Sequence, residues 1–208
     1  MIKAFIVDYG CGNIASLKYW LKSESIKSSL ISKKEDFKYL TSNGFIILPG
    51  VGHFGRAMQN IDKNGLRKFL TECKGKIPIL GICLGSQILL NNSHEDKNFY
   101  GLGLVKGQTI ALPENQSPRT GWYATKIESK QNIIKNRKLN AFNNFFYYNH
   151  SYVQLPCKSE SLSLLKTDQF CAGFIHKDHI VGLQFHPEKS QFAGKLVLKS
   201  VLKFFELL

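Results

Sequence analysis

Two hydrophobic patterns alternate along the first half of the chain. Continuous apolar runs, which are typical of buried strands, cover residues 2–7, 44–48 and 77–82. Apolar residues three or four positions apart, which are typical of amphipathic helices, cover residues 13–24 and 54–73, with a break near residues 64–65. Strands that alternate with helices predict a mainly parallel sheet with right-handed crossovers.

After residue 100 the pattern changes to short stretches of alternating apolar and polar residues with turn residues between them. These stretches are expected to be strands, over residues 101–112, 121–127, 145–153, 161–165, 170–176 and 180–185. They predict an antiparallel extension packed on the same sheet, and an amphipathic pattern over residues 191–208 predicts a closing helix. Because we find no linker, repeat or low-complexity tract, we expect residues 1–208 to form one α/β domain.

Composition narrows the class of protein. An apolar content of 43% with 21% charged residues is that of an ordinary globular protein, and no apolar run reaches the length of a membrane span. The first residues indicate a strand and not a signal peptide, because the apolar run ends at Asp8. Five scattered cysteines without a Cys-x-x-Cys pair favour neither a disulfide framework nor a zinc site, and they indicate a reducing cytoplasm.

The net charge of +13 is large, and nucleic acid, an anionic membrane surface or an acidic partner would each fit it. The lysines are dispersed, however, and neither an aromatic-interleaved RNA motif nor a recognition helix accompanies them. We interpret the charge as a lysine-rich solvated surface, and we expect neither nucleic acid nor membrane as a partner.

The most informative chemistry lies in residues 81–85, with the sequence Gly-Ile-Cys-Leu-Gly, between an apolar run and a helical pattern. This order is the cysteine version of a nucleophile elbow, in which two glycines permit a strained turn that exposes the middle side chain. A helix that begins after Cys83 and includes Leu84, Gln87, Leu89 and Leu90 would favour the thiolate through its dipole. The alternative is a structural cysteine in a tight turn.

A base and an acid for this nucleophile occur far downstream, at His186 and Glu188, with a proline between them. Alone, a histidine is usually a structural or surface residue. Together with Cys83, the imidazole can take the thiol proton, and the carboxylate can fix its tautomer. The three residues therefore predict nucleophilic catalysis by cysteine.

A third segment, Pro-Gly-Val-Gly over residues 49–52, follows the second predicted strand. Its glycines leave backbone N–H groups free to approach a ligand, and such groups suit an oxyanion hole together with the amide of Leu84. The alternative is a turn that only connects a strand to a helix.

Three other candidates receive a weaker interpretation. Cys11 has no base near it in the sequence, and we expect it to be passive. His176 and His179 have metal-ligand spacing, but they flank an expected turn, so we expect no metal there. His53 lies in the glycine-rich segment and could tune it.

These segments, together with residues 8–13, 150–152 and 182–190, resemble the class I glutamine amidotransferases. Within them the chain is most similar to the glutaminase subunits of imidazole glycerol phosphate synthases, and the resemblance covers essentially the whole chain. It implies glutamine hydrolysis through a cysteine thioester, without a cofactor or a metal. It implies Cys83 as nucleophile, His186 as acid and base, and Glu188 as the group that orients His186.

The resemblance also implies the residues that surround the reacting carboxamide. An oxyanion hole would comprise Val51, Gly52 and Leu84. Substrate-binding positions would comprise Gly50, Gln87, Glu95, Ser151 and Tyr152, with Glu95 meeting the α-ammonium group of glutamine.

Members of this family are coupled to a synthase that receives ammonia through a channel. The positions implied for this interface are Arg119, Trp122, Tyr147 and Lys189. Here the chain departs from the family, because Pro-Arg-Thr-Gly-Trp-Tyr stands at residues 118–123 and Asn149 replaces an apolar residue.

The departures leave the partner open. One hypothesis is a heterodimer with the cyclase subunit of histidine biosynthesis, which makes imidazole glycerol phosphate and AICAR. A second is a paralogue that supplies ammonia to a sugar amidotransferase of surface-glycan synthesis. A free glutaminase or peptidase is a third, and a purely regulatory role would be expected to lose a member of the triad, yet none is lost.

Overall fold

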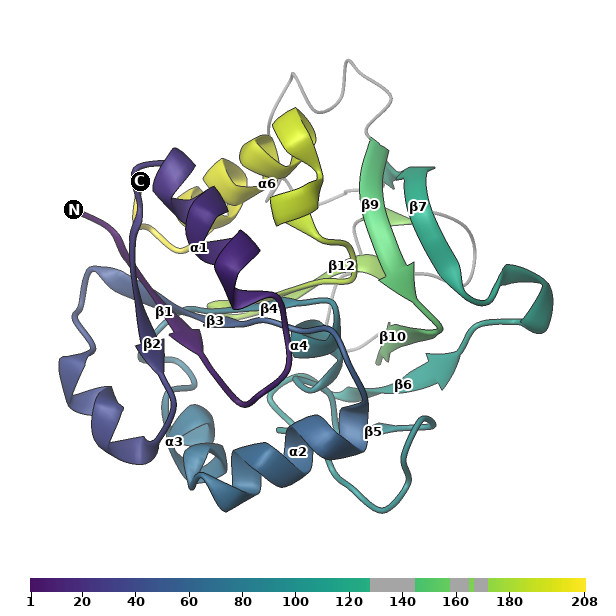
Figure 1. The fold of residues 1–208 in the computed structure, drawn as a ribbon, viewed down its shortest axis with the longest axis horizontal. Coiled ribbons are helices and arrows are strands. Elements are labelled where there is room, and N and C mark those ends of the chain that lie inside the picture. Colours follow the sequence, from purple (N-terminus) through teal and green to yellow (C-terminus); the bar gives the residue numbers. More distant parts are fainter. Residues whose placement is uncertain (128–144, 158–164, 167–171) are drawn as a thin grey trace.

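The computed structural model describes residues 1–127, 145–157, 165–166 and 172–208, and an eight-stranded sheet runs through its centre (Figure 1). Its strand order is β2-β1-β3-β4-β13-β12-β11-β8. The first five strands pair in parallel and the last three pair antiparallel. The bounds are β1 Lys3–Val7, β2 Lys27–Ile31, β3 Gly44–Leu48, β4 Ile79–Ile82, β8 Lys126–Ile127, β11 Leu165–Lys166, β12 Ala172–Lys177 and β13 Ile180–Leu183.

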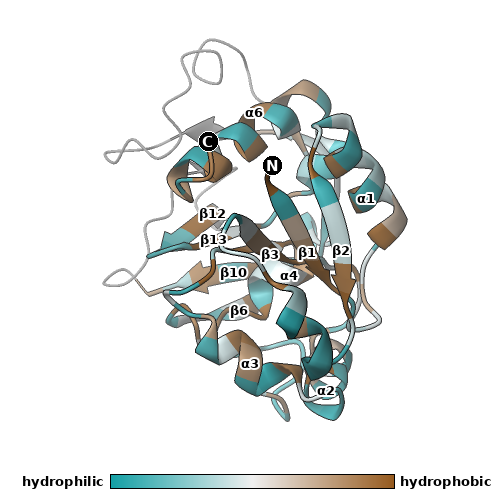
Figure 2. Ribbon diagram, turned by 90° about the vertical axis from the view of Figure 1, so that its left-hand side faces the viewer, coloured by the Kyte–Doolittle hydropathy of each residue, from teal (hydrophilic) through white to brown (hydrophobic). Residues whose placement is uncertain are grey.

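Helices cover both faces of this sheet, α1 and α6 on one and α2 and α3 on the other (Figure 1). Strand β1 explains why both faces are apolar: Ala4 and Ile6 join the core under α1 and α6, whereas Phe5 and Val7 join the core under α2 and α3. Figure 2 shows the resulting concentration of hydrophobic residues on the strands. The continuous apolar runs of the sequence therefore mark strands buried on two sides.

The predicted helices of the first half are confirmed. Helix α1 (Ile14–Ser23) begins after Asn13, whose side chain accepts a hydrogen bond from the Ser16 amide at 3.1 Å. Helices α2 (Phe54–Lys63) and α3 (Leu66–Glu72) are separated at Gly65, whose φ of 66° suits glycine. The closing helix α6 (Gln191–Phe204) ends four residues before the predicted end.

For the second half of the chain, the predicted type of element, short strands, is correct, but their predicted arrangement is partly wrong. Strands β12, β11 and β8 form the predicted antiparallel extension of the main sheet. Strand β13 was expected to belong to this extension, but it pairs in parallel with β4. Its four residues are all buried, as befits a central parallel strand. Residues 161–164 and 170–171 of the expected strands lie outside the described residues.

The remaining strands leave the main sheet, which the pattern did not predict. One small sheet has the order β10-β6-β5, with bounds Tyr152–Pro156, Gly107–Ala111 and Asn92–Ser93. A ribbon pairs β7 (Arg119–Ala124) with β9 (Phe145–His150). The α/β class with a mainly parallel central sheet is confirmed. Across the described part of the chain, the helices are too short or too polar to cross a bilayer.

Candidate active site

Strand β4 delivers Cys83 to the carboxyl edge of the sheet in a strained turn. Cys83 has φ 51° and ψ −110°, a backbone conformation that residues other than glycine rarely adopt. Close packing explains the following glycine, because a Cβ on Gly85 would lie 1.8 Å from the Leu48 carbonyl oxygen. The loop after β3 and the turn at Cys83 are therefore packed backbone to backbone.

The helix after this turn is shorter than predicted. Helix α4 spans only Leu84–Gln87, so Leu89 and Leu90 lie beyond it. The carbonyls of residues 88–90 accept hydrogen bonds from the amides of Leu102, Leu104 and Gly103, at 2.8–3.0 Å. Because these carbonyls bind a neighbouring segment, the helix ends after one turn.

The imidazole of His186 lies beside Cys83 and is held by Glu188. His186 Nδ1 and Glu188 Oε1 are 2.9 Å apart, and the two side chains are only 2% and 6% exposed. Burial lowers the pKa of His186, but the Cys83 sulfur and the Glu188 carboxylate together raise it to about 10. Glu188 engages Nδ1, which leaves Nε2 for the thiol. The arrangement can hold an imidazolium next to a nucleophilic sulfur.

The backbone around His186 is fixed by strand β9. The His186 amide donates to the Tyr147 carbonyl at 2.8 Å, and the Tyr147 amide donates to Ser190 Oγ at 3.0 Å. Ser190 Oγ in turn donates to the His186 carbonyl at 2.6 Å. The short 3₁₀ turn Pro187–Lys189 thus connects the imidazole to β9 on one side and to α6 on the other.

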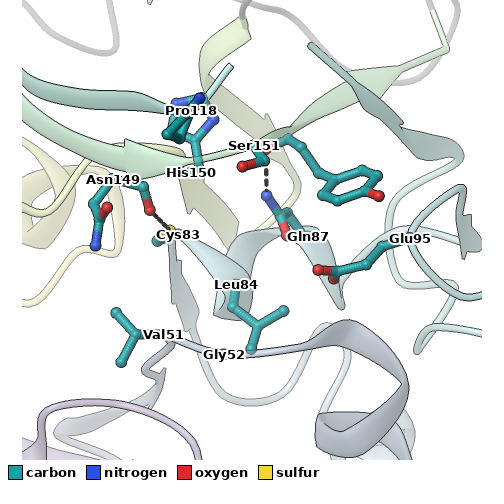
Figure 3. Close-up of a pocket in the computed structure, with 11 residues that line it drawn as sticks. Val51, Gly52, Cys83, Leu84, Gln87, Glu95, Pro118, Asn149, His150 and Ser151 are labelled. Atoms are coloured by element: carbon teal, nitrogen blue, oxygen red, sulfur yellow. Dashed lines mark hydrogen bonds between the residues drawn. The ribbon is translucent and has the colours of Figure 1, made fainter. Parts of the chain in front are cut away.

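A pocket of about 220 Å³ opens over the sulfur (Figure 3). Residues predicted for the nucleophile and the oxyanion hole line it, namely Val51, Gly52, Cys83 and Leu84. Predicted substrate-binding residues line it too, namely Gln87, Glu95, Ser151 and Tyr152. The structure therefore brings together eight positions that are spread over about one hundred residues of sequence.

Gly50 is placed differently from its neighbours. It does not belong to the pocket lining; instead a Cβ there would lie 2.5 Å from Leu84 Cβ and 2.6 Å from the Gly85 amide nitrogen. The loop after β3 is also fixed by Tyr9, whose buried hydroxyl donates a hydrogen bond to the Pro49 carbonyl. Gly52 has φ 133°, which is available to glycine.

Two polar residues of the pocket are tied to the protein itself. Gln87 Nε2 donates to the Tyr152 carbonyl at 2.7 Å. Glu95 Oε2 accepts from the Phe54 amide at 2.8 Å, at the beginning of α2. His53, which the sequence suggested as a tuning residue, accepts from the Gly55 amide at 3.2 Å and so caps the same helix.

Four residues near the sulfur were not predicted as site residues. Pro118, Asn149 and His150 line the pocket, and Gln184 Nε2 lies 4.0 Å from the sulfur. A signal was present, because Gln184 precedes His186 by two residues, and Asn149 and His150 precede the predicted Ser151.

The predicted interface residues divide into two groups. The first group is Trp122, Tyr147 and Lys189, and Trp122 is 44% exposed. The Trp122 ring packs edge-on against the Tyr147 ring, with ring centroids 6.0 Å apart. Lys189 Nζ lies 5.0 Å from the centroid of the Tyr147 ring. Arg119, in contrast, is only 4% exposed and donates to Gln116 Oε1 at 3.0 Å. The guanidinium of Arg119 is thus engaged inside the chain, and its role at the partner interface or channel stays a prediction.

The weaker candidates do not form further sites. Cys11 is buried, and burial raises the pKa of its thiol. His176 and His179 both pack against the Phe204 ring. Within the described ranges, histidine, cysteine and acidic side chains do not gather in groups of three that could hold a metal ion.

A strained cysteine beside a buried histidine–glutamate pair, at the carboxyl edge of a mainly parallel sheet, defines an enzyme with a cysteine nucleophile. The chain belongs to the class-I glutamine amidotransferases, a family that matches residues 5–201. It is 35% identical over 204 residues to the imidazole glycerol phosphate synthase subunit HisH of Aquifex aeolicus, covering 96% of this chain and 95% of the relative. The subunit of that name from Methanocaldococcus jannaschii is 35% identical over 206 residues, with 98% of each chain covered.

Solved structures share the fold. A crystal structure of a glutamine amidotransferase has a TM-score of 0.75 at 15% identity, covering 97% of this chain and 98% of that one. A structure of PurLQS from Thermotoga maritima has a TM-score of 0.70 at 20% identity, with 97% and 98% covered.

Proposed function

We propose that this chain is the glutaminase subunit of an imidazole glycerol phosphate synthase. It would hydrolyse L-glutamine to glutamate and ammonia and pass the ammonia to a cyclase subunit in a heterodimer. The cyclase would use the ammonia to form imidazole glycerol phosphate and AICAR. The observation that carries the proposal is the pairing of Cys83 with the buried His186–Glu188 couple at the wall of a pocket in a class-I amidotransferase.

The chemistry follows from the protonation of the pair. His186 Nε2 takes the thiol proton, and the electron pair left on sulfur attacks the side-chain carboxamide of glutamine. The imidazolium then gives its proton to the departing amine, which leaves as ammonia, and a γ-glutamyl thioester remains on Cys83. Water, deprotonated by His186, cleaves the thioester and releases glutamate. Glu188 stabilises the imidazolium in both halves of the reaction and fixes its tautomer.

The pocket supplies binding and charge stabilisation. The amides of Val51, Gly52 and Leu84 are the candidates for the developing oxyanion. Gly50 supports this loop by its contact with the turn at Cys83. The polar groups of Gln87, Ser151 and Tyr152 suit the amino-acid end of glutamine, and the Glu95 carboxylate suits its α-ammonium group by charge.

The cyclase would dock on the exposed side of the β7–β9 ribbon, which carries the half-exposed Trp122, with Tyr147 and Lys189 beside it. The name shared by the relatives favours this partner over a sugar amidotransferase. We further propose that the whole chain, residues 1–208, forms one amidotransferase domain. We place the enzyme in the cytoplasm, where free cysteines such as Cys83 stay reduced.

The test is glutamate release from L-glutamine by this chain, alone and mixed with a cyclase subunit and a nucleotide substrate analogue. We expect strong stimulation that disappears in the Cys83→Ala variant. Cys157→Ala is the matched control, because Cys157 is exposed and does not belong to the pocket lining. High turnover without the partner would refute the coupled model, and stimulation only by a sugar amidotransferase would refute the pathway.

A further inference from the structure

Strand β9 contacts both members of the nucleophile–base pair through its main chain. The Tyr147 carbonyl accepts a hydrogen bond from the His186 amide at 2.8 Å. Two residues later, the Asn149 carbonyl accepts from the Cys83 thiol at 3.8 Å, a contact that Figure 3 shows directly. The backbone carbonyls of residues two apart on a strand point to the same edge of that strand. The carbonyls of one strand therefore contact both the thiol and the backbone of the base.

The contact between the thiol and Asn149 opposes catalysis. The proton that the Cys83 sulfur donates to the Asn149 carbonyl is the proton that His186 must take before the sulfur can attack. While the thiol donates this hydrogen bond to the carbonyl, its proton is not offered to His186. Movement of the Asn149 carbonyl away from the sulfur would remove the acceptor and leave His186 Nε2 as the receiver of the proton.

The opposite edge of β9 links the same residue to the exposed ribbon. Asn149 lies directly across from Thr120 on β7, and Thr120 Oγ1 donates to Asn149 Oδ1 at 3.2 Å. Both residues are exposed, on the ribbon that also presents Trp122. A two-stranded ribbon has little stability of its own, so a partner that packs on it can shift it as a unit.

We infer that Asn149 is a latch on the nucleophile: its carbonyl holds the Cys83 thiol in a hydrogen bond in the free chain, and docking of the synthase subunit on the β7–β9 ribbon releases the thiol. The Thr120–Asn149 hydrogen bond holds the latch closed. This inference rests on the proposed function, because the docking partner is the one proposed above. Asn149 is a positioning residue, because its side chain, bonded to Thr120, fixes the position of the backbone carbonyl that contacts the thiol.

The test measures the reactivity of Cys83 in the free chain. Iodoacetamide is added to the full chain at neutral pH, and alkylation of the peptide that contains Cys83 is followed by mass spectrometry, which separates it from the other cysteines. We expect Thr120→Val and Asn149→Ala each to raise the rate about two- to tenfold, the range for loss of one side-chain hydrogen bond. The double variant should be no faster than either single variant, because both remove the same bond.

Two controls separate the latch from a general loosening of the fold. Thr120→Ser keeps the hydroxyl and should alkylate at the wild-type rate. Thr71→Val removes a hydroxyl that donates to helix carbonyls, at 2.7 and 3.1 Å, and should also leave the rate unchanged. Wild-type rates in Thr120→Val and Asn149→Ala would overturn the inference, as would an equal increase in Thr120→Ser.

The same variants are then compared in the presence of the cyclase subunit and its substrate analogue. Wild type should gain more alkylation rate on docking than Thr120→Val, because the variant starts with the latch open. If the cyclase fails to stimulate wild-type glutaminase while Thr120→Val still alkylates faster, the proposed partner is wrong and the latch stands. If the cyclase stimulates but Thr120→Val matches wild type in the free chain, the latch is wrong and the function stands.

Discussion

Replacing Glu188 with glutamine keeps the shape of the site and removes the negative charge from beside His186. The distance from His186 Nδ1 to Glu188 Oε1 is 2.9 Å and both side chains are nearly inaccessible, so solvent screens this interaction little. A hydrogen bond to a charged group contributes about 1.5–3 kcal/mol. Because one pKa unit corresponds to about 1.4 kcal/mol, the pKa of His186 should fall by about one to two units in Glu188→Gln.

The consequence for activity has a definite sign. His186 must be protonated to donate to the departing amine, so activity is lost as the pH rises through the pKa of His186, which is about 10 in the wild type. In Glu188→Gln the alkaline limb of the kcat profile should therefore move to lower pH by the same one to two units. The maximal kcat should also fall, by about ten- to a hundredfold, since the same energy no longer stabilises the imidazolium.

The assay is glutamate release by the cyclase-stimulated complex, from neutral to strongly alkaline pH. Glu206→Gln is the control, because it removes an exposed carboxylate at the far end of the chain. An unchanged alkaline limb with an unchanged maximal kcat in Glu188→Gln would show that Glu188 does not set the protonation of His186. The reasoning from its geometry would then be refuted.

Three further changes test other parts of the structure. Gly50→Ala places a Cβ 2.5 Å from Leu84 Cβ, which should displace the oxyanion loop and lower kcat about 10²- to 10³-fold in the glutaminase assay; near-normal kcat would exclude that role. Trp122→Ala should weaken cyclase binding about thirtyfold by calorimetry and leave alkylation of Cys83 in the free chain unchanged; equal affinity would move the docking face elsewhere. Burial lowers the pKa of His176 below 6.5 in the folded chain. On acidification this histidine therefore takes up a proton in the unfolded chain at a higher pH than in the folded chain. The free energy of unfolding should then decrease as the pH falls below 6.5, by up to about 1.4 kcal/mol per pH unit. His176→Gln should reduce this loss in urea unfolding at two pH values, whereas an identical loss would mean that His176 is not responsible.

The sequence predicts the parts of the fold that depend on local pattern. The four residues that end at Val7 are all apolar because each face of β1 meets a different helical layer. The break before α3 is visible because Gly65 adopts a positive φ. The elbow around Cys83 can be recognised in the sequence by Gly85, because the close approach of this residue to the Leu48 carbonyl leaves no room for a side chain.

The parts that were missed depend on tertiary contacts. Strand β2 is an edge strand with the sequence Lys-Ser-Ser-Leu-Ile, which carries little apolar signal. The direction of β13 depends on its pairing with β4, and its apolar run fits either direction. The residue type of Arg119 is typical of a surface, but Gln116 and the Tyr123 ring accommodate its guanidinium inside the chain.

The short α4 helix changes the account of how Cys83 becomes reactive. A helix dipole is a sum over aligned peptide groups, and four residues supply only a small part of it. Three neighbours contact the sulfur directly: the His186 imidazole, Gln184 Nε2 at 4.0 Å and the Asn149 carbonyl oxygen at 3.8 Å. Two of these neighbours, His186 and Asn149, are tied to β9, so the position of one strand sets both contacts with the sulfur. A nucleophile built in this way responds to whatever packs on the ribbon outside it, which a nucleophile activated by its own helix would not do.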